Sequence, residues 1–486
     1  MLKEIANRSC GYARRFLMGS RLAYLLAHIP NMLVGVAIVL GFAHLVSPEE
    51  YGVFSVGFAF INIAGAIFYG WLQMALVRLG GGAAGQLGPK AFTVFLALLA
   101  PVIPCLILGL TLDWLNVLDY GAAAALAASA YSGASAASQL ARGLNSPKMY
   151  GLIGSLRFIL ILVCAYGLVH FNASANSLLI AIAIGSSASI AAGLFYMPKA
   201  LRENSARSAL AESKASISLP RLISYGLPAS LSLIAMMLML NGDRFILKMM
   251  FDAKVVALYS SQSGIARQMI YPFIGALSIS VVPSGVKALN EHGLNAAMNF
   301  VVKESRAILF VVAPLVVVVM AFGANIARAI LPVGYREGAE WIMPMSAFSA
   351  LLMGCRLVRY DPAFHLQLRS REIGKCALAS LVAWLVLLPL LTKLYGPIGA
   401  AIAGVIAGAV ALMFAEWELG ATASVKNMFP WKFMVGIVAA ALILATVKQI
   451  YLQMEGVALI TFLAILLFAL IAFCYSLRKR LKKDVI

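Results

Sequence analysis

Charged residues are scarce in this chain of 486 residues, and acidic residues are the scarcest of them. Asp, Glu, Lys and Arg together make up 12% of the chain, against about 25% in soluble domains. Hydrophobic residues make up 62%, and the mean hydropathy is +0.92. Because a membrane-spanning helix needs about 20 apolar residues, this composition predicts a polytopic membrane protein and excludes an ordinary soluble domain.

Cysteine is also rare, with six residues and no CxxC motif or Cys/His cluster. The sequence therefore predicts neither a disulfide framework nor a metal site, and no cofactor is expected. A cleavable signal peptide is not evident, because the first apolar run, from Leu22, is too long and no small-residue cleavage pattern follows it.

Long apolar runs occupy most of the chain. They predict an all-α membrane protein with fourteen spans, near residues 22–44, 52–76, 91–112, 119–141, 149–171, 174–197, 222–247, 255–284, 301–324, 341–358, 374–395, 397–418, 432–452 and 457–477. Ser47, Pro48 and Glu50 are typical of a helix start, so we expect a tight capped turn between the first two spans. The fourth span is dominated by small residues, which suit close packing or the lining of a cavity.

The net charge of +19 would suggest nucleic-acid binding in a soluble protein, but the positions of the charges indicate otherwise. If the N-terminus is cytoplasmic, 29 of the 38 Lys and Arg residues lie at cytoplasmic ends and loops, in segments 1–21, 78–90, 142–148, 199–221, 287–306, 356–375, 426–432 and 478–483. This bias follows the positive-inside rule and predicts that both termini are cytoplasmic, with no nucleic-acid partner.

Two short internal matches suggest that the chain contains two copies of one design. A shift of 205 residues places Ser47 on Asp252 and Phe54-Ser55 on Tyr259-Ser260. A shift of 217 residues places the segment 129–132 on 346–349 and 140–142 on 357–359. Six spans per copy give both bundles the same orientation, as in transporters that carry their substrate between two bundles.

The domain organisation follows from this repeat and from the polar interruptions. We expect a basic N-terminal segment at 1–21, a six-helix bundle at 22–197, a cytoplasmic linker at 198–221, a second six-helix bundle at 222–420, an additional helix pair at 430–478 and a basic tail at 479–486.

A few polar residues lie within the expected spans, where charge is costly and usually faces a protein interior or water. The cations Arg157, Arg267, Arg244 and Lys248 are candidates for a substrate-binding cavity, which we expect Arg157 and Arg267 to share. Another helix could instead supply a carboxylate partner for Arg157. Coupling or gating candidates are Asp243, His28 and Asn31, although His28 could equally be a buried core histidine.

Two stretches carry a family resemblance: LVSPEEYGVFSVGFAFINIAGAIF at 45–68 and DRFILKMMFDAKVVALYSS at 243–261. They resemble the polysaccharide-export (O-antigen) flippases of the multidrug/oligosaccharidyl-lipid/polysaccharide (MOP) superfamily, with an acidic-tyrosine-glycine turn after the first span and a Leu-Tyr-Ser element after the seventh. Val256-Ala257 before Leu258 departs from the usual glycine.

The resemblance implies two six-helix bundles in a V shape, a bacterial inner-membrane location and transport of a lipid-linked oligosaccharide by alternating access. Membrane lipids, a polysaccharide polymerase and glycosyltransferases are the implied partners.

Two other functions compete with a flippase. A cation-coupled multidrug antiporter of the same superfamily would need carboxylates within the spans, and this chain has almost none there. A membrane-embedded oligosaccharide polymerase or ligase would need a long external loop with catalytic groups, but the external gaps are short. We therefore expect a transporter and not an enzyme.

Overall fold

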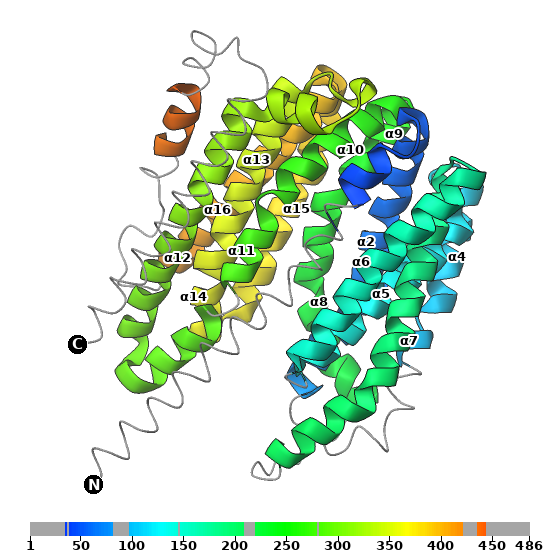
Figure 1. The fold of residues 1–486 in the computed structure, drawn as a ribbon. Coiled ribbons are helices and arrows are strands. Elements are labelled where there is room, and N and C mark those ends of the chain that lie inside the picture. The colour runs from blue at the N-terminus through cyan, green and yellow to red at the C-terminus, as the bar shows by residue number, and fades with distance from the viewer. Residues whose placement is uncertain are drawn as a thin grey trace. The chain divides into compact units, whose positions relative to one another are not determined.

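The structure is a computed structural model that describes residues 35, 38–80, 97–143, 146–208, 219–278, 281–420 and 435–443. Helices form almost all of this part of the chain, and it contains no strand (Figure 1). Nine helices in the same residues are long and apolar enough to cross a membrane. The all-α prediction is therefore confirmed, whereas the total of fourteen spans stays a prediction.

The chain divides into two compact units, Met1–Ser261 and Gln262–Ile486. The first unit contains α2 (Pro48–Gly80), α4 (Val102–Trp114), α5 (Gly121–Gly143), α6 (Pro147–Phe171), α7 (Ala175–Ser208), α8 (Leu219–Asn241), α9 (Asp243–Met250) and the start of α10 (Ala253–Gln268). Its helix α8 packs along α2. The domain bounds drawn from the sequence stay a prediction.

The second unit contains the end of α10 and the remaining elements. These are α11 (Tyr271–Ser278), α12 (Val281–Ile330), the 3-10 turn η1 (Val333–Tyr335), α13 (Ala339–Cys355), the π-helical turn η2 (Arg356–Tyr360), α14 (Asp361–Leu366), α15 (Ser370–Tyr395), α16 (Pro397–Gly420) and a helical stretch at 435–443.

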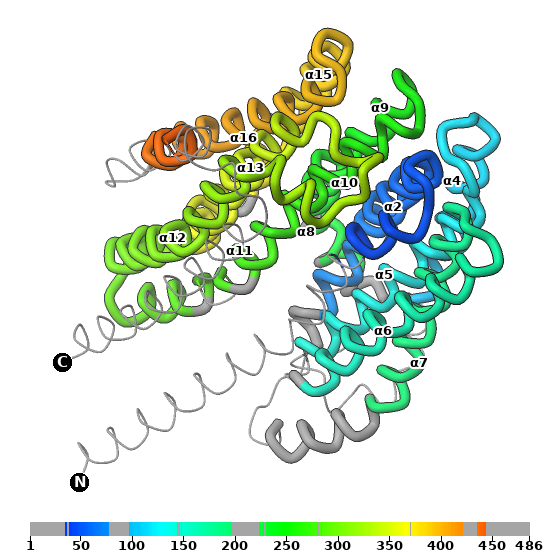
Figure 2. The backbone as a smooth tube through the Cα atoms, turned by 45° about the horizontal axis from the view of Figure 1, so that its top comes forward, coloured from blue at the N-terminus to red at the C-terminus, as the bar shows by residue number. Residues whose placement is uncertain are grey.

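Corresponding helices pair in the same way within each unit. In the first unit α4 packs on α5, α5 on α7 and α6 on α7. In the second unit α12 packs on α13, α13 on α16 and α15 on α16. The views in Figures 1 and 2 agree that α5, α6 and α7 lie side by side. The pairing is the one expected if the two units repeat one bundle design.

The turn before α2 and the turn before α10 correspond in the repeat, and both are capped by a side chain. Ser47 Oγ accepts a hydrogen bond from the Glu50 amide at 3.3 Å, and Asp252 Oδ1 accepts one from the Val255 amide at 2.9 Å. Each side chain therefore satisfies an amide of the first turn of its helix, which has no partner within the helix. The carboxylate of Glu50 accepts the Ala175 amide at 2.6 Å and so caps α7 as well. The predicted capped turn is confirmed.

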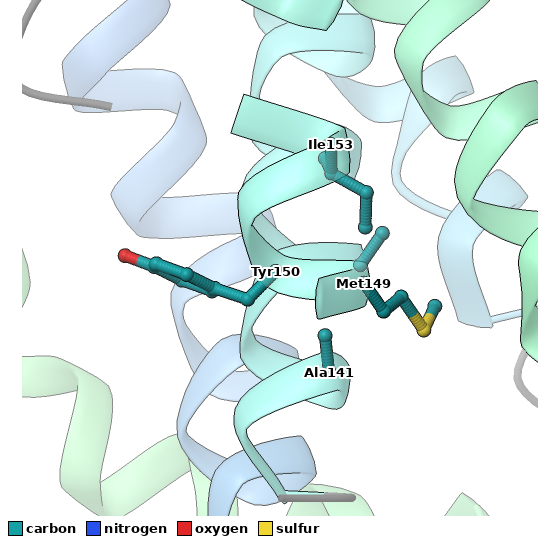
Figure 3. Packing of buried hydrophobic residues seen from close by; sticks show 5 residues of the cluster. Ala141, Met149, Tyr150 and Ile153 are labelled. Carbon is teal, nitrogen blue, oxygen red and sulfur yellow. The ribbon is translucent and has the colours of Figure 1, made fainter. Parts of the chain in front are cut away.

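The small residues of α5 serve close packing. This helix lies against α2, α4, α6 and α7, and Ser132 approaches Gly65 so closely that a Cβ there would overlap its hydroxyl. A buried apolar cluster joins the end of α5 to the start of α6, with Ala141 and Met149 near each other (Figure 3). Small side chains bring the helices close enough for such contacts.

The prediction of one continuous span at 255–284 is wrong, because the helix is interrupted. Helix α10 ends at Gln268, α11 begins at Tyr271, and α12 begins at Val281. Pro272 suits a helix start because it has no N–H to leave unsatisfied there. Farther along, α12 is kinked at Gly293, whose φ of +80° is unfavourable for other residues.

Candidate functional site

The junction of α8 and α9 holds the densest polar cluster of the first unit. Helix α8 ends at Asn241, and α9 starts after Gly242. The carboxylate of Asp243 is 1% exposed and accepts a hydrogen bond from the Tyr259 hydroxyl at 2.6 Å. Arg244 donates to Asn241 Oδ1 at 2.7 Å and to Ser260 Oγ at 3.2 Å. Asn241 and Arg244 are three residues apart, and this hydrogen bond brings their side chains together.

The residues of this cluster come from α9 and from α10, the helix that follows it. Tyr259 and Ser260 lie on α10, one helix after Asp243 and Arg244 on α9. Asp243 and Arg244 carry opposite charges side by side, which lowers the cost of burying either one. Asp243 therefore has a hydrogen-bond donor in Tyr259, and its role in coupling stays a prediction.

Lys248 forms an ion pair with Asp119, at 2.5 Å between Nζ and Oδ2. The Lys248 side chain is 21% exposed, and the Asp119 side chain is 43% exposed. Asp119 belongs to the turn between α4 and α5, so the pair ties α9 to that turn. The charge of Lys248 is neutralised by this partner, and its role in substrate binding stays a prediction.

Arg157 lies on α6 and is held by α5. Its guanidinium carbon is 4.8 Å from the centre of the Tyr131 ring, and its Nη1 donates to Ser135 Oγ at 3.1 Å. The side chain is 5% exposed. Tyr131 and Ser135 are one turn apart, so α5 presents an aromatic face and a hydroxyl to the same guanidinium.

Arg267 occupies the last turn of α10 in the second unit and is half-buried. It lies within electrostatic reach of Tyr271, at the start of α11, and so does Arg356. A cavity shared by Arg157 and Arg267 stays a prediction. His28 and Asn31 lie outside the described residues.

A charged cluster in the second unit was not predicted from the sequence. Residues 356–375 were counted among the cytoplasmic ends and loops, whereas Arg356, Arg359 and Asp361 are buried side chains of the continuous helical stretch α13–η2–α14. Arg356 Nε lies 3.5 Å from Asp361 Oδ1. The Tyr360 hydroxyl donates to Glu416 Oε2 on α16 at 2.7 Å. The burial of Arg356 and Arg359 was therefore not foreseen from the sequence, whereas their place on the cytoplasmic side stays a prediction.

One signal in the sequence could have located this cluster. Arg356 and Asp361 are five residues apart, which is the spacing that a π-helical turn brings together. Asp361 is followed by Pro362, a pair typical of a helix start, so the segment also marks the beginning of α14.

The buried charges are unequal in sign. Among the described residues, the buried charged side chains are four arginines and two aspartates: Arg157, Arg244, Arg356, Arg359, Asp243 and Asp361. No cluster of His, Cys, Asp and Glu that could hold a metal occurs in the same part of the chain. The buried interior therefore carries an excess of positive charge, which is better suited to an anionic than to a cationic cargo.

The sequence matches no family model and no curated protein. Solved structures with a similar fold include the lipid II flippase MurJ and two MATE transporters. The lipid II flippase MurJ, in an inward closed conformation, has a TM-score of 0.62 and 14% identity, covering 95% of this chain and 99% of its own.

A multidrug resistance MATE family transporter of the MOP superfamily, facing inward, has a TM-score of 0.52 and 15% identity, covering 80% of this chain and 98% of its own. The eukaryotic MATE transporter AtDTX14 has a TM-score of 0.56 and 14% identity, covering 89% and 100%. Identities this low establish the fold alone. The chain has the fold shared by the MurJ flippase and the MATE transporters of the MOP superfamily.

Proposed function

We propose that this protein is a flippase that moves a polyprenyl-diphosphate-linked oligosaccharide across the bacterial inner membrane by alternating access, for surface polysaccharide synthesis. The observation that carries the proposal is the excess of buried arginines over buried carboxylates in the described residues. Charges of one sign are costly inside a membrane protein unless a ligand or a partner compensates them.

The chemistry of the cargo matches this excess. A diphosphate is strongly anionic, and its passage through a region of low dielectric needs fixed positive charge along the way. Arginine is suited to phosphate, because its planar guanidinium makes paired hydrogen bonds to phosphate oxygens. Arg157 and Arg244 in the first unit, and Arg267 in the second, are the proposed contacts.

The fold similarity is compatible with this cargo. One neighbour is named as a lipid II flippase, one as a multidrug resistance MATE family transporter and one as a eukaryotic MATE transporter. A cation-coupled multidrug antiporter is the alternative. It is less favoured because Asp361 lies 3.5 Å from Arg356 and Asp243 is next to Arg244. An arginine close to a carboxylate repels a metal cation that would bind there.

Arg157→Ala tests the proposal by removing a cation from the interior of the first unit. The Tyr131 ring and the Ser135 hydroxyl that contact Arg157 are both neutral. The substitution therefore leaves neither of these two groups as an uncompensated charge. We expect loss of glycan export with near-normal protein abundance. Arg157→Lys should restore part of the export, because it keeps the charge and the aromatic contact but loses the planar fork.

The measurement is complementation of surface polysaccharide in cells that lack the flippase, with protein level followed by blot. Arg267→Ala should behave like Arg157→Ala. Gly167→Ala is a control on the same helix as Arg157, because a Cβ at Gly167 would meet nothing within 4 Å. Full export by both arginine-to-alanine variants would refute the cationic path.

A further inference from the structure

Arg359 is the largest side chain that is almost completely buried in the described part of the chain. It is 1% exposed, and its Nε has no hydrogen-bond partner. No hydrogen bond or ion pair of this residue is found among the described residues. A guanidinium has five N–H donors and keeps its charge in proteins, so burial without an anion is strongly unfavourable.

The neighbouring carboxylates are already engaged. Asp361 lies 3.5 Å from Arg356, and Glu416 accepts the hydroxyl of Tyr360 at 2.7 Å. Glu416 is within electrostatic reach of Arg359 but forms no ion pair with it in the described structure. Arg359 therefore adds a positive charge to a cluster whose acidic side chains have other partners.

A second cation lies beside Arg359 and faces outward. Arg306 on α12 is within electrostatic reach of Arg359, and its side chain is exposed. Like charges placed together repel each other, and an anion between them turns that repulsion into attraction. The second unit therefore has one exposed and one buried arginine within electrostatic reach of each other.

The backbone at this point is unusual. Arg359 lies in η2, which packs against α11, α12 and α16. A π-helical turn contains one residue more than an α-helical turn and is often found at functional sites. The repeat-related residue Arg142 ends an ordinary α-helix, is half-buried and donates to Gln139 at 3.0 Å. The irregular turn and the buried guanidinium thus occur together in one copy of the repeat only.

We propose that Arg359 and Arg306, with Arg356 beside them, form a phosphate-binding site in the second unit. The ligand is a phosphate group, either the headgroup of an anionic phospholipid or the diphosphate of a lipid-linked substrate. Both present the oxygen geometry that a guanidinium fork recognises. A phospholipid ligand would be independent of the proposed function, whereas a lipid-linked diphosphate ligand rests on it.

Hydrogen–deuterium exchange of the full-length protein in a non-ionic detergent tests the site. Pyrophosphate is added at constant ionic strength, and exchange is followed in the segment 351–366 and, for comparison, in 237–261. We expect pyrophosphate to slow exchange in 351–366 about tenfold, because ligand binding stabilises the bound conformation. Arg359→Gln should abolish this protection, and Arg142→Gln should retain it.

A second arm replaces pyrophosphate with phosphatidylglycerol vesicles and uses phosphatidylcholine vesicles as the control. Protection by pyrophosphate, or by phosphatidylglycerol in excess of the control, supports the site and identifies the source of the phosphate. If Arg359→Gln does not fold, Arg306→Gln is the substitute, because its exposed side chain is not part of the buried core; it should weaken the protection.

Two outcomes would overturn the inference. One is protection in 351–366 that is unchanged in the Arg359 variant, or in the Arg306 variant where that is the substitute. The other is the absence of protection in this segment with either phosphate source. Protection confined to 237–261 also belongs to the second outcome, and it would leave the proposed flippase function standing. Export measured on the Arg157 variants decides that function separately.

Discussion

Replacing the buried Arg356 with methionine should lower the stability of the protein, whereas replacing its buried neighbour Arg359 should raise it. Arg356 and Arg359 lie one turn apart in η2 and are 7% and 1% exposed. Arg356 has a carboxylate partner in Asp361, and Arg359 has no ion pair in the described chain. Methionine fills a similar volume without charge, so each substitution isolates the electrostatic contribution of the guanidinium.

The magnitudes follow from the partners. Arg356→Met leaves the Asp361 carboxylate, whose side chain is 12% exposed, without its ion pair. Breaking a buried pair in this way typically costs about 3–5 kcal/mol. Arg359→Met removes a buried charge and leaves no paired carboxylate behind. Replacement of buried charge by apolar side chains is often stabilising, by about 1–4 kcal/mol in favourable cases.

The assay is thermal unfolding of purified protein in a non-ionic detergent and phosphate-free buffer. The unfolding midpoint should fall for Arg356→Met and rise for Arg359→Met. The double variant Arg356→Met/Asp361→Leu should recover most of the loss, because it removes both members of the pair. A fall of similar size for both single variants would refute the reasoning, since Arg359 would then have a compensating partner.

Two further predictions concern packing and a buried hydrogen bond in the first unit. Gly52→Ala should sharply reduce the yield of folded protein, because the added Cβ would overlap the backbone carbonyl of Ala253. Gly167→Ala should leave the yield unchanged, and size-exclusion profiles of the two variants distinguish these outcomes; equal profiles would contradict the prediction. Tyr259→Phe removes the donor 2.6 Å from Asp243 and should lower stability by about 1–3 kcal/mol in the same unfolding assay. A rise in the unfolding midpoint would show that the Asp243 carboxylate does not depend on this donor.

Much of the fold could be predicted because the membrane makes hydrophobicity decisive. Apolar runs located α6, α15 and α16 within a few residues, and the start of α7 within one residue, because a helix that crosses a membrane needs about 20 apolar residues. The turn before α2 was predictable for a local reason. Ser47 satisfies a backbone amide only three residues away, so its role depends on neighbours in sequence.

The break after α10 was harder to predict. The segment 255–284 is apolar enough to suggest one span, but the helix stops at Gln268 and restarts at Tyr271. The polar residues 260–263 just before this break are all buried. Among them, the Gln262 side-chain amide donates to the backbone carbonyls of Tyr335 and Glu337 at 2.9 Å and 2.7 Å. These partners are more than 70 residues away in the sequence, so local patterns contain no trace of them.

The burial of the charged cluster in η2 was not predicted because hydropathy and burial differ there. Three charged residues in six, at 356–361, resemble a solvent-exposed loop in any averaged profile. Their burial is tolerated because Arg356 forms an ion pair with Asp361, and the adjacent Tyr360 hydroxyl donates to Glu416 on α16. Compensation of this kind depends on tertiary structure, and a hydropathy window cannot detect it.

The two copies of the repeat differ most informatively at Arg142 and Arg359. In the first unit the helix ends one residue after Arg142, so its guanidinium stays half-buried and bonds to a neighbour one turn away. In the second unit the helical path continues through η2 into α14, and this continuation encloses Arg359. An arginine that only served the positive-inside bias would have no need of burial. The enclosure of Arg359, at the energetic cost of a buried charge, therefore favours a ligand-binding role for this copy over a purely topological one.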